Sequence, residues 1–478
     1  MARRRSPWPR PQIQASRDAA GVIRRRSPRL HPQTQVSEEG AGVIRRRSPR
    51  LHPHIQANVK VSGVIGRRRR RRRGTSPAAT ASLPDGDDVL WEIFLRLPPQ
   101  PSSLPRASAV CKQWRRIVGD PKFHRQFHAH HRKPPLLGVF LRGGKEEGIV
   151  FNPILDPPDR IPPRRFSLEL PSNGGDHDVL YCRHRPGSNC DDHDLLHCRH
   201  GLVLVKECVS GEVIVCDPIT GKQRRVAVPP VFKWDHLWGV VLCAAGDQGH
   251  VHGSCHSSPF KVVLLSLFRQ DRQSLACVYS SETGEWGDLI LGEGPYYIQN
   301  SVAYATLVGN VLYWAFNGNC ILEFDLDRQN LAATAGPPIT PDFYYGDSQI
   351  IHAEDGAVGF AILAHSRFRM WQRNVNCQGV ATWVPWKTIE MCNILGLSLT
   401  WEQMTWMGYD EDNDVIFLYV GHNVYSVQLK SMESKKIYEA YWISEIHPFT
   451  SFYTTGTSID GGSNPAEMLH GTSDACLV

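Results

Sequence analysis

The chain has 478 residues, a formal net charge of +7 and 41% hydrophobic residues, which is typical of a globular protein with more than one structured region. No apolar run reaches the roughly 18 residues of a membrane-spanning helix, so we expect no membrane partner. The 13 cysteines are odd in number and scattered along the chain. This pattern favours free thiols in the cytosol or nucleus over a disulfide framework.

Positive charge is concentrated at the N-terminus. Residues 1–74 hold 21 Lys and Arg against 3 acidic residues, whereas the rest of the chain holds 33 against 44. The sequence GVIRRRSPRLHP begins at Gly21 and is repeated from Gly42. These repeats carry too few apolar side chains to offset the entropy lost on ordering the backbone. We therefore predict a disordered tail over residues 1–82.

Seven consecutive arginines near the end of this tail form a candidate nuclear-import signal. They are Arg67, Arg68, Arg69, Arg70, Arg71, Arg72 and Arg73. The same charge would attract phosphates, but Trp8 is the one aromatic residue in the tail, so bases would find little to stack on. We expect localisation in the nucleus and cytoplasm and do not expect nucleic acid as a main partner.

Helical periodicity appears over residues 83–127. Leu90, Ile93, Phe94 and Leu97 follow the i, i+3, i+4, i+7 spacing of one helix face, and Pro98-Pro99 should end that helix. A second apolar stripe runs from Val110 to Val118, and further apolar residues follow it. The segment is predicted to form a small all-α domain of three helices.

From residue 128 to about 450 the hydrophobic period changes to two. Short apolar runs alternate with turns at Gly211, Gly318 and Gly421, and intermediate strand clusters give a unit of about 50 residues. This period predicts an all-β propeller of roughly six to eight blades, with a β-sandwich as the alternative. Residues 451–478 are predicted to form a flexible tail.

The helical segment resembles the F-box. The matching residues are Leu83-Pro84, Leu90, Ile93, Leu97-Pro98, Leu104, Val110-Cys111-Lys112, Trp114-Arg115-Arg116, Asp120-Pro121 and Phe123. The continuation, with Gly-Leu-Val-Leu-Val from Gly201 and Cys-Asp-Pro-Ile-Thr-Gly-Lys from Cys216, is similar to the kelch-like, F-box-associated β-propeller of plant F-box proteins.

This resemblance implies that the helices bind a Skp-type adaptor and, through it, a cullin-RING ubiquitin ligase. A segment this short exposes more apolar surface than its own core can cover, so a partner should bury the rest. The residues expected to bind the adaptor are Leu83, Pro84, Leu90, Ile93, Leu97, Pro98, Leu104, Val110 and Trp114. Trp114 could equally belong to the internal core, and the helices could also cap the propeller without any partner.

The function implied is that of a non-catalytic substrate adaptor in a Skp-cullin-F-box ligase, with the propeller capturing an unknown protein target. No catalytic motif of the hydrolase, zinc-protease or phosphate-loop kind is present, so we expect no catalytic residues. The alternative is a nuclear, RNA-associating scaffold that uses the basic tail and has a non-functional F-box.

Aromatic residues of the β-rich segment are candidate target contacts or blade packing. They are Trp286, Tyr296, Tyr297, Tyr344, Tyr345, Trp371 and Trp406. A duplicated His/Cys pattern runs from His177 to His184 and from His193 to His200, with Cys190 between the copies. Its spacing fits no familiar zinc motif. We expect no metal and no cofactor.

Overall fold

The structure is a computed structural model of the chain. It describes residues 86–142, 148–170, 193–232, 237–246, 250–268, 273–293, 304–316, 319–340, 347–398 and 403–454. Of the two compact units, Met1–Pro77 and Ala78–Val478, these residues all belong to the second. The predicted tail over 1–82, with its arginines, lies outside the described residues, as do residues 455–478.

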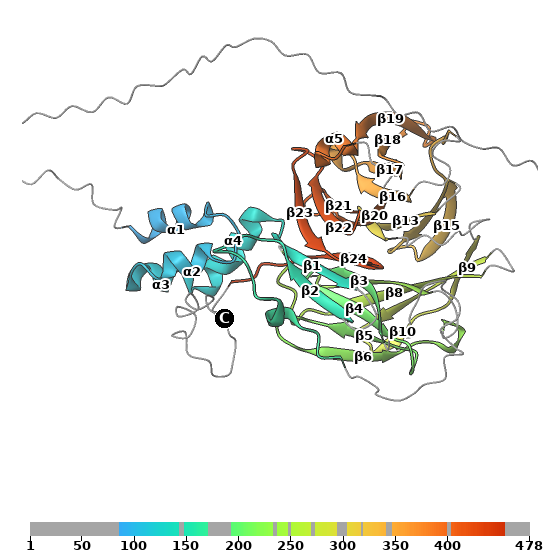
Figure 1. Cartoon of the computed structure of the whole chain (residues 1–478). Helices are drawn as coiled ribbons and strands as arrows, with labels where there is room; N and C mark the ends of the chain where they lie inside the picture. Colours follow the sequence, from blue (N-terminus) through green and yellow to red (C-terminus); the bar gives the residue numbers. More distant parts are fainter. Residues whose placement is uncertain are drawn as a thin grey trace, which may run out of the picture. The chain divides into compact units, whose positions relative to one another are not determined.

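The described part of the F-box segment contains four helices where we predicted three. They are α1 (Asp87–Leu95), α2 (Ser103–Ser108), α3 (Lys112–Val118) and α4 (Pro121–His131) (Figure 1). Helix α4 begins where the Asp120 carboxylate accepts a hydrogen bond from the Lys122 N–H at 2.7 Å, with Pro121 in the first turn. This arrangement satisfies a free backbone donor at the helix start. The helix continues four residues beyond the predicted boundary at 127.

These helices share one small core. Its buried members are Leu90, Phe94, Leu95, Leu104, Ala107, Ile117, Val118, Phe123 and Phe127. The rings of Phe94 and Phe123 meet edge to face, with centroids 6.5 Å apart. Each helix is too short to be stable alone, so this shared core holds them together.

The remaining described strands form six separate antiparallel sheets. Blade 1 contains β1 (Leu136–Arg142), β2 (Ile149–Pro153) and β24 (Glu445–Thr450). Blade 2 contains β3 (His193–Arg199), β4 (Leu202–Glu207), β5 (Glu212–Cys216) and β6 (Gln223–Ala227). Blade 3 contains β7 (Leu237–Cys243), β8 (Phe260–Phe268), β9 (Gln273–Ser280), β10 (Glu285–Trp286) and β11 (Ile290–Glu293).

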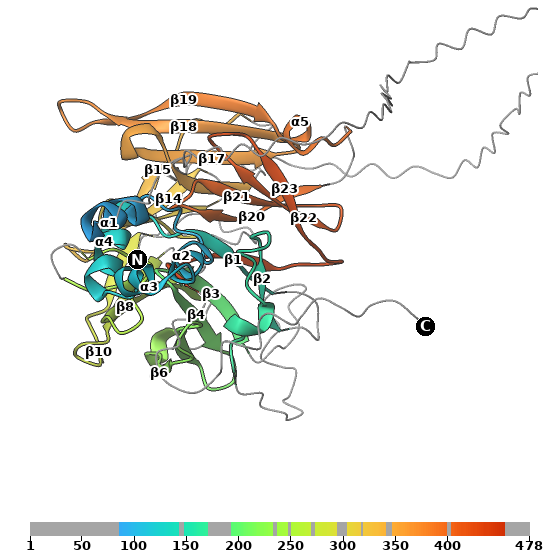
Figure 2. The ribbon, with the colours of Figure 1, turned by 90° about the vertical axis from the view of Figure 1, so that its left-hand side faces the viewer.

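Blades 4 to 6 have four strands each. Blade 4 contains β12 (Thr306–Val308), β13 (Val311–Phe316), β14 (Cys320–Asp325) and β15 (Asn330–Ala335). Blade 5 contains β16 (Asp347–His352), β17 (Val358–Ala364), β18 (Arg367–Val375) and β19 (Ala381–Glu390), and its last two strands form the long hairpin of Figure 2. Blade 6 contains β20 (Met404–Asp410), β21 (Val415–Val420), β22 (Asn423–Gln428) and β23 (Ser434–Glu439).

Short helices occur among the strands. They are the single-turn helices η1 (Pro163–Phe166), η2 (Pro230–Phe232) and η4 (Glu354–Gly356), and the α-helix α5 (Met391–Leu395). The six-bladed propeller confirms the predicted fold class and lies within the predicted range of blades. No helix in the described ranges is both long enough and apolar enough to cross a bilayer.

Each blade packs between two neighbours, and β4 shows how its sequence encodes this. Leu202 and Leu204 enter the core shared with blade 3, whereas Val203 and Val205 enter the core shared with blade 1. Because successive side chains of a strand point to opposite faces, a strand buried on both faces is a continuous apolar run. The Gly-Leu-Val-Leu-Val segment is such a run.

The ring is closed by β24, which pairs antiparallel with β1 although the two strands are separated by most of the chain. Leu136 lies opposite Thr450, and Arg142 lies opposite Glu445. One face of β24 places Phe449 in the core shared with blade 2, and the other places Ile446 in the core shared with blade 6. The last blade therefore depends on both ends of the propeller sequence.

The packed region extends past the predicted boundary at 450. Ser451, Phe452 and Tyr453 are buried, and the Ser451 hydroxyl donates a hydrogen bond to the Gly253 carbonyl at 2.7 Å. The part of the predicted C-terminal tail that the structure describes is thus fixed on the propeller.

Two hairpin turns with related sequences, Ile219-Thr-Gly-Lys222 and Glu282-Thr-Gly-Glu285, have the same backbone geometry. In each turn the glycine has a positive φ, 73° at Gly221 and 76° at Gly284. Each glycine N–H also donates to the carbonyl four residues earlier, at 2.8 Å and 2.9 Å respectively. Glycine adopts this backbone conformation without the steric cost of a Cβ.

A buried ion pair ties distant blades together near the propeller axis. The guanidinium of Arg199, at the end of β3, donates two hydrogen bonds to the carboxylate of Glu411, which follows β20. The same carboxylate accepts the Leu307 N–H of blade 4 at 3.0 Å. Removing one partner would leave the other charge buried without compensation.

His447 of β24 makes the closure sensitive to pH. Burial lowers the pKa of His447 to about 3 from its ordinary value of 6.5. Below pH 6.5 the unfolded chain binds a proton here that the folded chain does not bind until the pH approaches 3. The stability conferred by neutral His447 is therefore present above pH 6.5 and is lost as the pH falls.

Between roughly pH 7.5 and pH 5, we expect the unfolding free energy of the wild type to fall by about 2 kcal/mol more than that of His447→Gln. Chemical denaturation at the two pH values measures this difference. The matched control is His365→Gln at an exposed position, which leaves the buried His447 in place. Equal pH dependence of His447→Gln and wild type would contradict the assignment.

Candidate functional site

The F-box helices expose apolar side chains next to their buried ones. On α1, Leu90 is 2% exposed and lies in the core, whereas Val89 is 49% exposed and Ile93 is 43% exposed. Val89 and Ile93 are four residues apart and so lie on one face of the helix. Val110, between α2 and α3, is 58% exposed. The F-box therefore has an uncovered apolar surface beside its own core.

The predicted adaptor-binding residues divide into three groups. Ile93, Pro98 and Val110 are exposed, and Leu97 and Trp114 are partly buried. Leu90 and Leu104 are buried within the F-box, so their side chains form its core, and their direct contact with the adaptor stays a prediction. They pack with Phe94 and Phe123 in the shared core of the four helices. Leu83 and Pro84 lie outside the described residues.

Trp114 packs against the F-box core and is also partly exposed to solvent. Its ring meets the ring of buried Phe94 edge to face, with centroids 4.8 Å apart, and the side chain remains partly exposed. Large aromatic side chains contribute strongly wherever they are buried. One part of Trp114 thus belongs to the F-box core, and the other part is available to a partner.

Ion pairs fix the relative position of α1 and α3. The Asp87 carboxylate lies 2.5 Å from Arg116 and accepts a hydrogen bond from the Gln113 amide at 2.9 Å. Asp87 and Arg116 are solvent-exposed, and an ion pair contributes little to stability at such a position. The pair orients the helices and adds little to their packing energy.

A pair of exposed aromatics lies at the opposite end of blade 1 from the F-box. The chain enters β1 at Leu136, beside the end of β24, whereas the loop 440–444 leads into the beginning of β24. In that loop Tyr441 is 87% exposed and Trp442 is 41% exposed. The Tyr441 ring stacks on His422, with centroids 5.0 Å apart.

The loop is held by hydrogen bonds to its backbone, which leaves the rings free for a partner. The Tyr419 hydroxyl donates to the Tyr441 carbonyl at 2.8 Å, and His422 Nδ1 lies 3.1 Å from the same oxygen. Sequence reasoning missed Tyr441 and Trp442. The signal that could have located them is an aromatic pair in the connection that closes the ring.

The aromatic candidates proposed from the sequence that the structure describes are packing residues. Trp371 and Trp406 are buried, and the Trp286 indole N–H donates to the Ala227 carbonyl of the neighbouring blade at 2.8 Å. The candidates at 296, 297, 344 and 345 lie outside the described residues.

Four side chains in the described ranges could hold a metal ion. They are Cys243, His250, His252 and Cys255. A hydrogen bond between the two thiols lowers the pKa of Cys243 and raises the pKa of Cys255, as expected of two sulfur atoms that share one proton. The sequence analysis did not predict this group. The part of that duplication before His193 lies outside the described residues.

Comparison with known proteins identifies both regions. Residues 194–455 match the family described as "F-box protein AT5G49610-like, beta-propeller". Residues 81–130 match the family described as "F-box-like", which extends beyond the predicted end at 127 and includes most of α4. No curated protein matches the chain.

Among solved structures, the chain is similar to a structural genomics protein of unknown function from Bacteroides thetaiotaomicron VPI-5482. The two share 10% sequence identity with a TM-score of 0.31. The match covers 56% of this chain and 64% of the other, less than two thirds of its length. At this level of similarity nothing further follows.

The four-helix segment with its uncovered apolar side chains and the six-bladed ring thus agree with the two family matches. The propeller family spans more than half of the chain. The chain belongs to the F-box proteins that carry an AT5G49610-like β-propeller.

Proposed function

We propose that this protein is the substrate-recognition adaptor of a Skp-cullin-F-box ubiquitin ligase. The observation that carries the proposal is the uncovered apolar surface of the F-box, where Val89, Ile93 and Val110 are exposed beside a complete core. Exposed apolar side chains beside a complete core are the kind of surface that a protein partner buries. The family match to the F-box supports a Skp-type adaptor as the partner.

The chain would act by proximity and not by chemistry of its own. The F-box would attach it to the ligase, while the propeller would hold a protein target near the ubiquitin-charged enzyme. Holding two reactants together replaces a bimolecular encounter with an effectively unimolecular step. This division of labour requires no catalytic residue in either region.

The adaptor interface is tested by placing charge on the exposed apolar surface. We expect Ile93→Asp combined with Val110→Asp to weaken binding of a purified Skp-type adaptor by at least about 100-fold, because an aspartate would be buried without a partner. Isothermal calorimetry on the full chain measures the affinity. Thermal unfolding of the same variant should remain close to that of the wild type.

Two control variants distinguish the loss of a binding surface from the loss of F-box stability. Val209→Asp with Val375→Asp adds the same charge at exposed valines of the propeller and should leave adaptor binding unchanged. Leu90→Ala should instead destabilise the F-box by about 2 to 5 kcal/mol. If the Ile93 and Val110 double variant folds and still binds with wild-type affinity, the adaptor proposal is wrong.

We propose that Tyr441 and Trp442 contact the target. Exposed aromatics are frequent anchors of protein interfaces, and the chain connection places them at the end of blade 1 away from the F-box. Tyr441→Ser combined with Trp442→Ser should retain adaptor binding and lose ubiquitinated targets. Quantitative affinity enrichment after proteasome inhibition measures both, with Val375→Ser as the control. An unchanged target set would exclude these residues.

We further propose that the arginine run directs part of the protein to the nucleus. The support is the density of positive charge from Arg67 to Arg73, which suits an acidic import receptor. Replacing the seven arginines with glutamine in a fluorescent fusion should move the protein toward the cytoplasm without changing adaptor affinity. An unaltered nuclear fraction, measured by microscopy, would refute this.

A further inference from the structure

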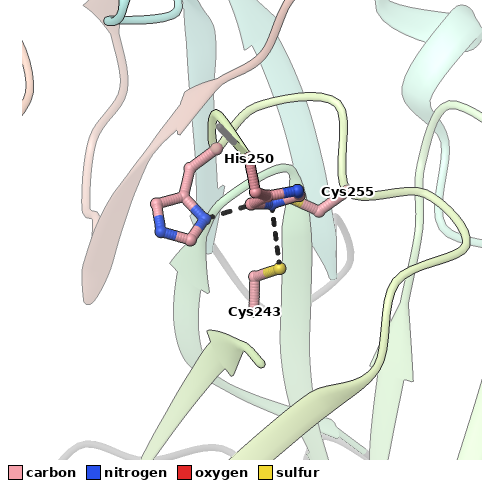
Figure 3. A group of neighbouring side chains, drawn as sticks. Cys243, His250 and Cys255 are labelled. Carbon is pink, nitrogen blue, oxygen red and sulfur yellow. Dashed lines mark hydrogen bonds between the residues drawn. The ribbon is translucent and has the colours of Figure 1, made fainter. Parts of the chain in front are cut away.

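A group of Cys and His side chains lies in the connection between β7 and β8. Cys243 ends β7, and His250, His252 and Cys255 follow it before β8 begins at Phe260 (Figure 3). One ligand atom from each side chain lies within 4.8 Å of all the others. His250 Nε2 is 3.3 Å from Cys243 Sγ and 3.4 Å from Cys255 Sγ.

The spacing of these atoms matches a tetrahedral metal site. Zinc bonds of about 2.3 Å to sulfur and about 2.0 to 2.1 Å to nitrogen place neighbouring ligand atoms about 3.3 to 3.8 Å apart. The two distances to His250 Nε2 fall in this range, as does the 3.8 Å between His252 Nδ1 and Cys255 Sγ. The widest pair needs to close by about 1 Å for all four to bind one ion.

We propose that Cys243, His250, His252 and Cys255 bind one zinc ion in a closed structural site. Two thiolates and two imidazoles suit zinc, whereas magnesium and calcium require oxygen ligands. Four protein ligands complete the tetrahedron and leave no position for a substrate. The ion would therefore stabilise the fold and take no part in a reaction.

A fifth side chain supports the ligands from outside. The ring of His200, in the turn between β3 and β4, stacks on His252 with centroids 3.7 Å apart and planes 9° from parallel. His200 Nδ1 accepts the Cys243 backbone N–H at 3.1 Å. Contacts of this kind orient metal ligands and are often needed for tight binding. His200 belongs to the duplicated His/Cys pattern of the sequence, and it acts here as a neighbour of the ligands.

Residues between the ligands make the contacts that the ion would stabilise. Gly253 has a φ of 102°, and its carbonyl accepts hydrogen bonds from Ser451 and from the Phe452 N–H, the latter at 2.9 Å. The Ser254 hydroxyl lies 3.3 Å from His128 Nδ1 of α4. Fixing this connection would hold the segment that follows β24, and with it the closure of the ring.

A disulfide between Cys243 and Cys255 is the competing use of the two sulfurs. Both are free thiols in the structure, and a disulfide would give the two histidines no reason to converge on them. The scattered free cysteines elsewhere also favour a reducing compartment. Direct measurement of metal and thiol distinguishes the two.

The test is the metal content of the full chain, purified without chelator and without a metal-affinity step. We expect about one zinc per chain by plasma mass spectrometry, and less than about one fifth of that in Cys243→Ser with Cys255→Ser. The control, Cys111→Ser with Cys377→Ser at exposed cysteines, should retain the metal. Cobalt(II) added to the apoprotein should give the visible spectrum of a tetrahedral site with thiolate ligands.

A second measurement uses the wild-type chain, so its result does not depend on whether the variants fold. Chelation of the wild-type chain should lower its unfolding temperature, and zinc should restore it. His252→Gln, the mildest ligand change, should show a smaller shift with chelator. The proposal is wrong if the wild type contains no zinc or if the cysteine variants hold as much metal as the wild type. It is also wrong if non-reducing peptide mapping finds a Cys243–Cys255 disulfide.

Discussion

The pairing of β24 with β1 is the constraint on which the rest of the structure depends. Every blade has two neighbours, and six cores lie between consecutive blades. β24 contributes Phe449 to one of these cores and Ile446 to another. Without that strand, two of the six cores would open and both faces of blade 1 would meet water.

The same pairing places the two proposed binding sites at opposite ends of blade 1. The F-box chain reaches the propeller where β24 finishes, and the aromatic loop with Tyr441 and Trp442 lies where β24 begins. A ligase subunit and a target bound at these sites would not compete for one surface. The antiparallel register of one strand pair therefore separates the two proposed binding activities.

Polar groups collect around the closure because many strand ends meet there. His447 is buried in β24 itself, Glu411 joins Arg199 to Leu307, and Gly253 receives the residues that follow β24. Buried polar groups are costly unless each has a partner. The proposed zinc would be one more element that fixes this region, acting on the connection that carries Gly253.

The sequence by itself determined the features that repeat or are local. Apolar runs such as Leu202 to Val205 identified buried strands, and the 50-residue interval identified the propeller, because strand period and blade length are properties of neighbouring residues. Helical spacing located α1 but could not say which of Leu90 and Ile93 would be buried, since that depends on how short helices share one core. Only the tertiary structure brought Cys243, Cys255 and His200 together and exposed Tyr441 and Trp442. These proximities are set by blade packing and ring closure, which join residues that no local pattern relates.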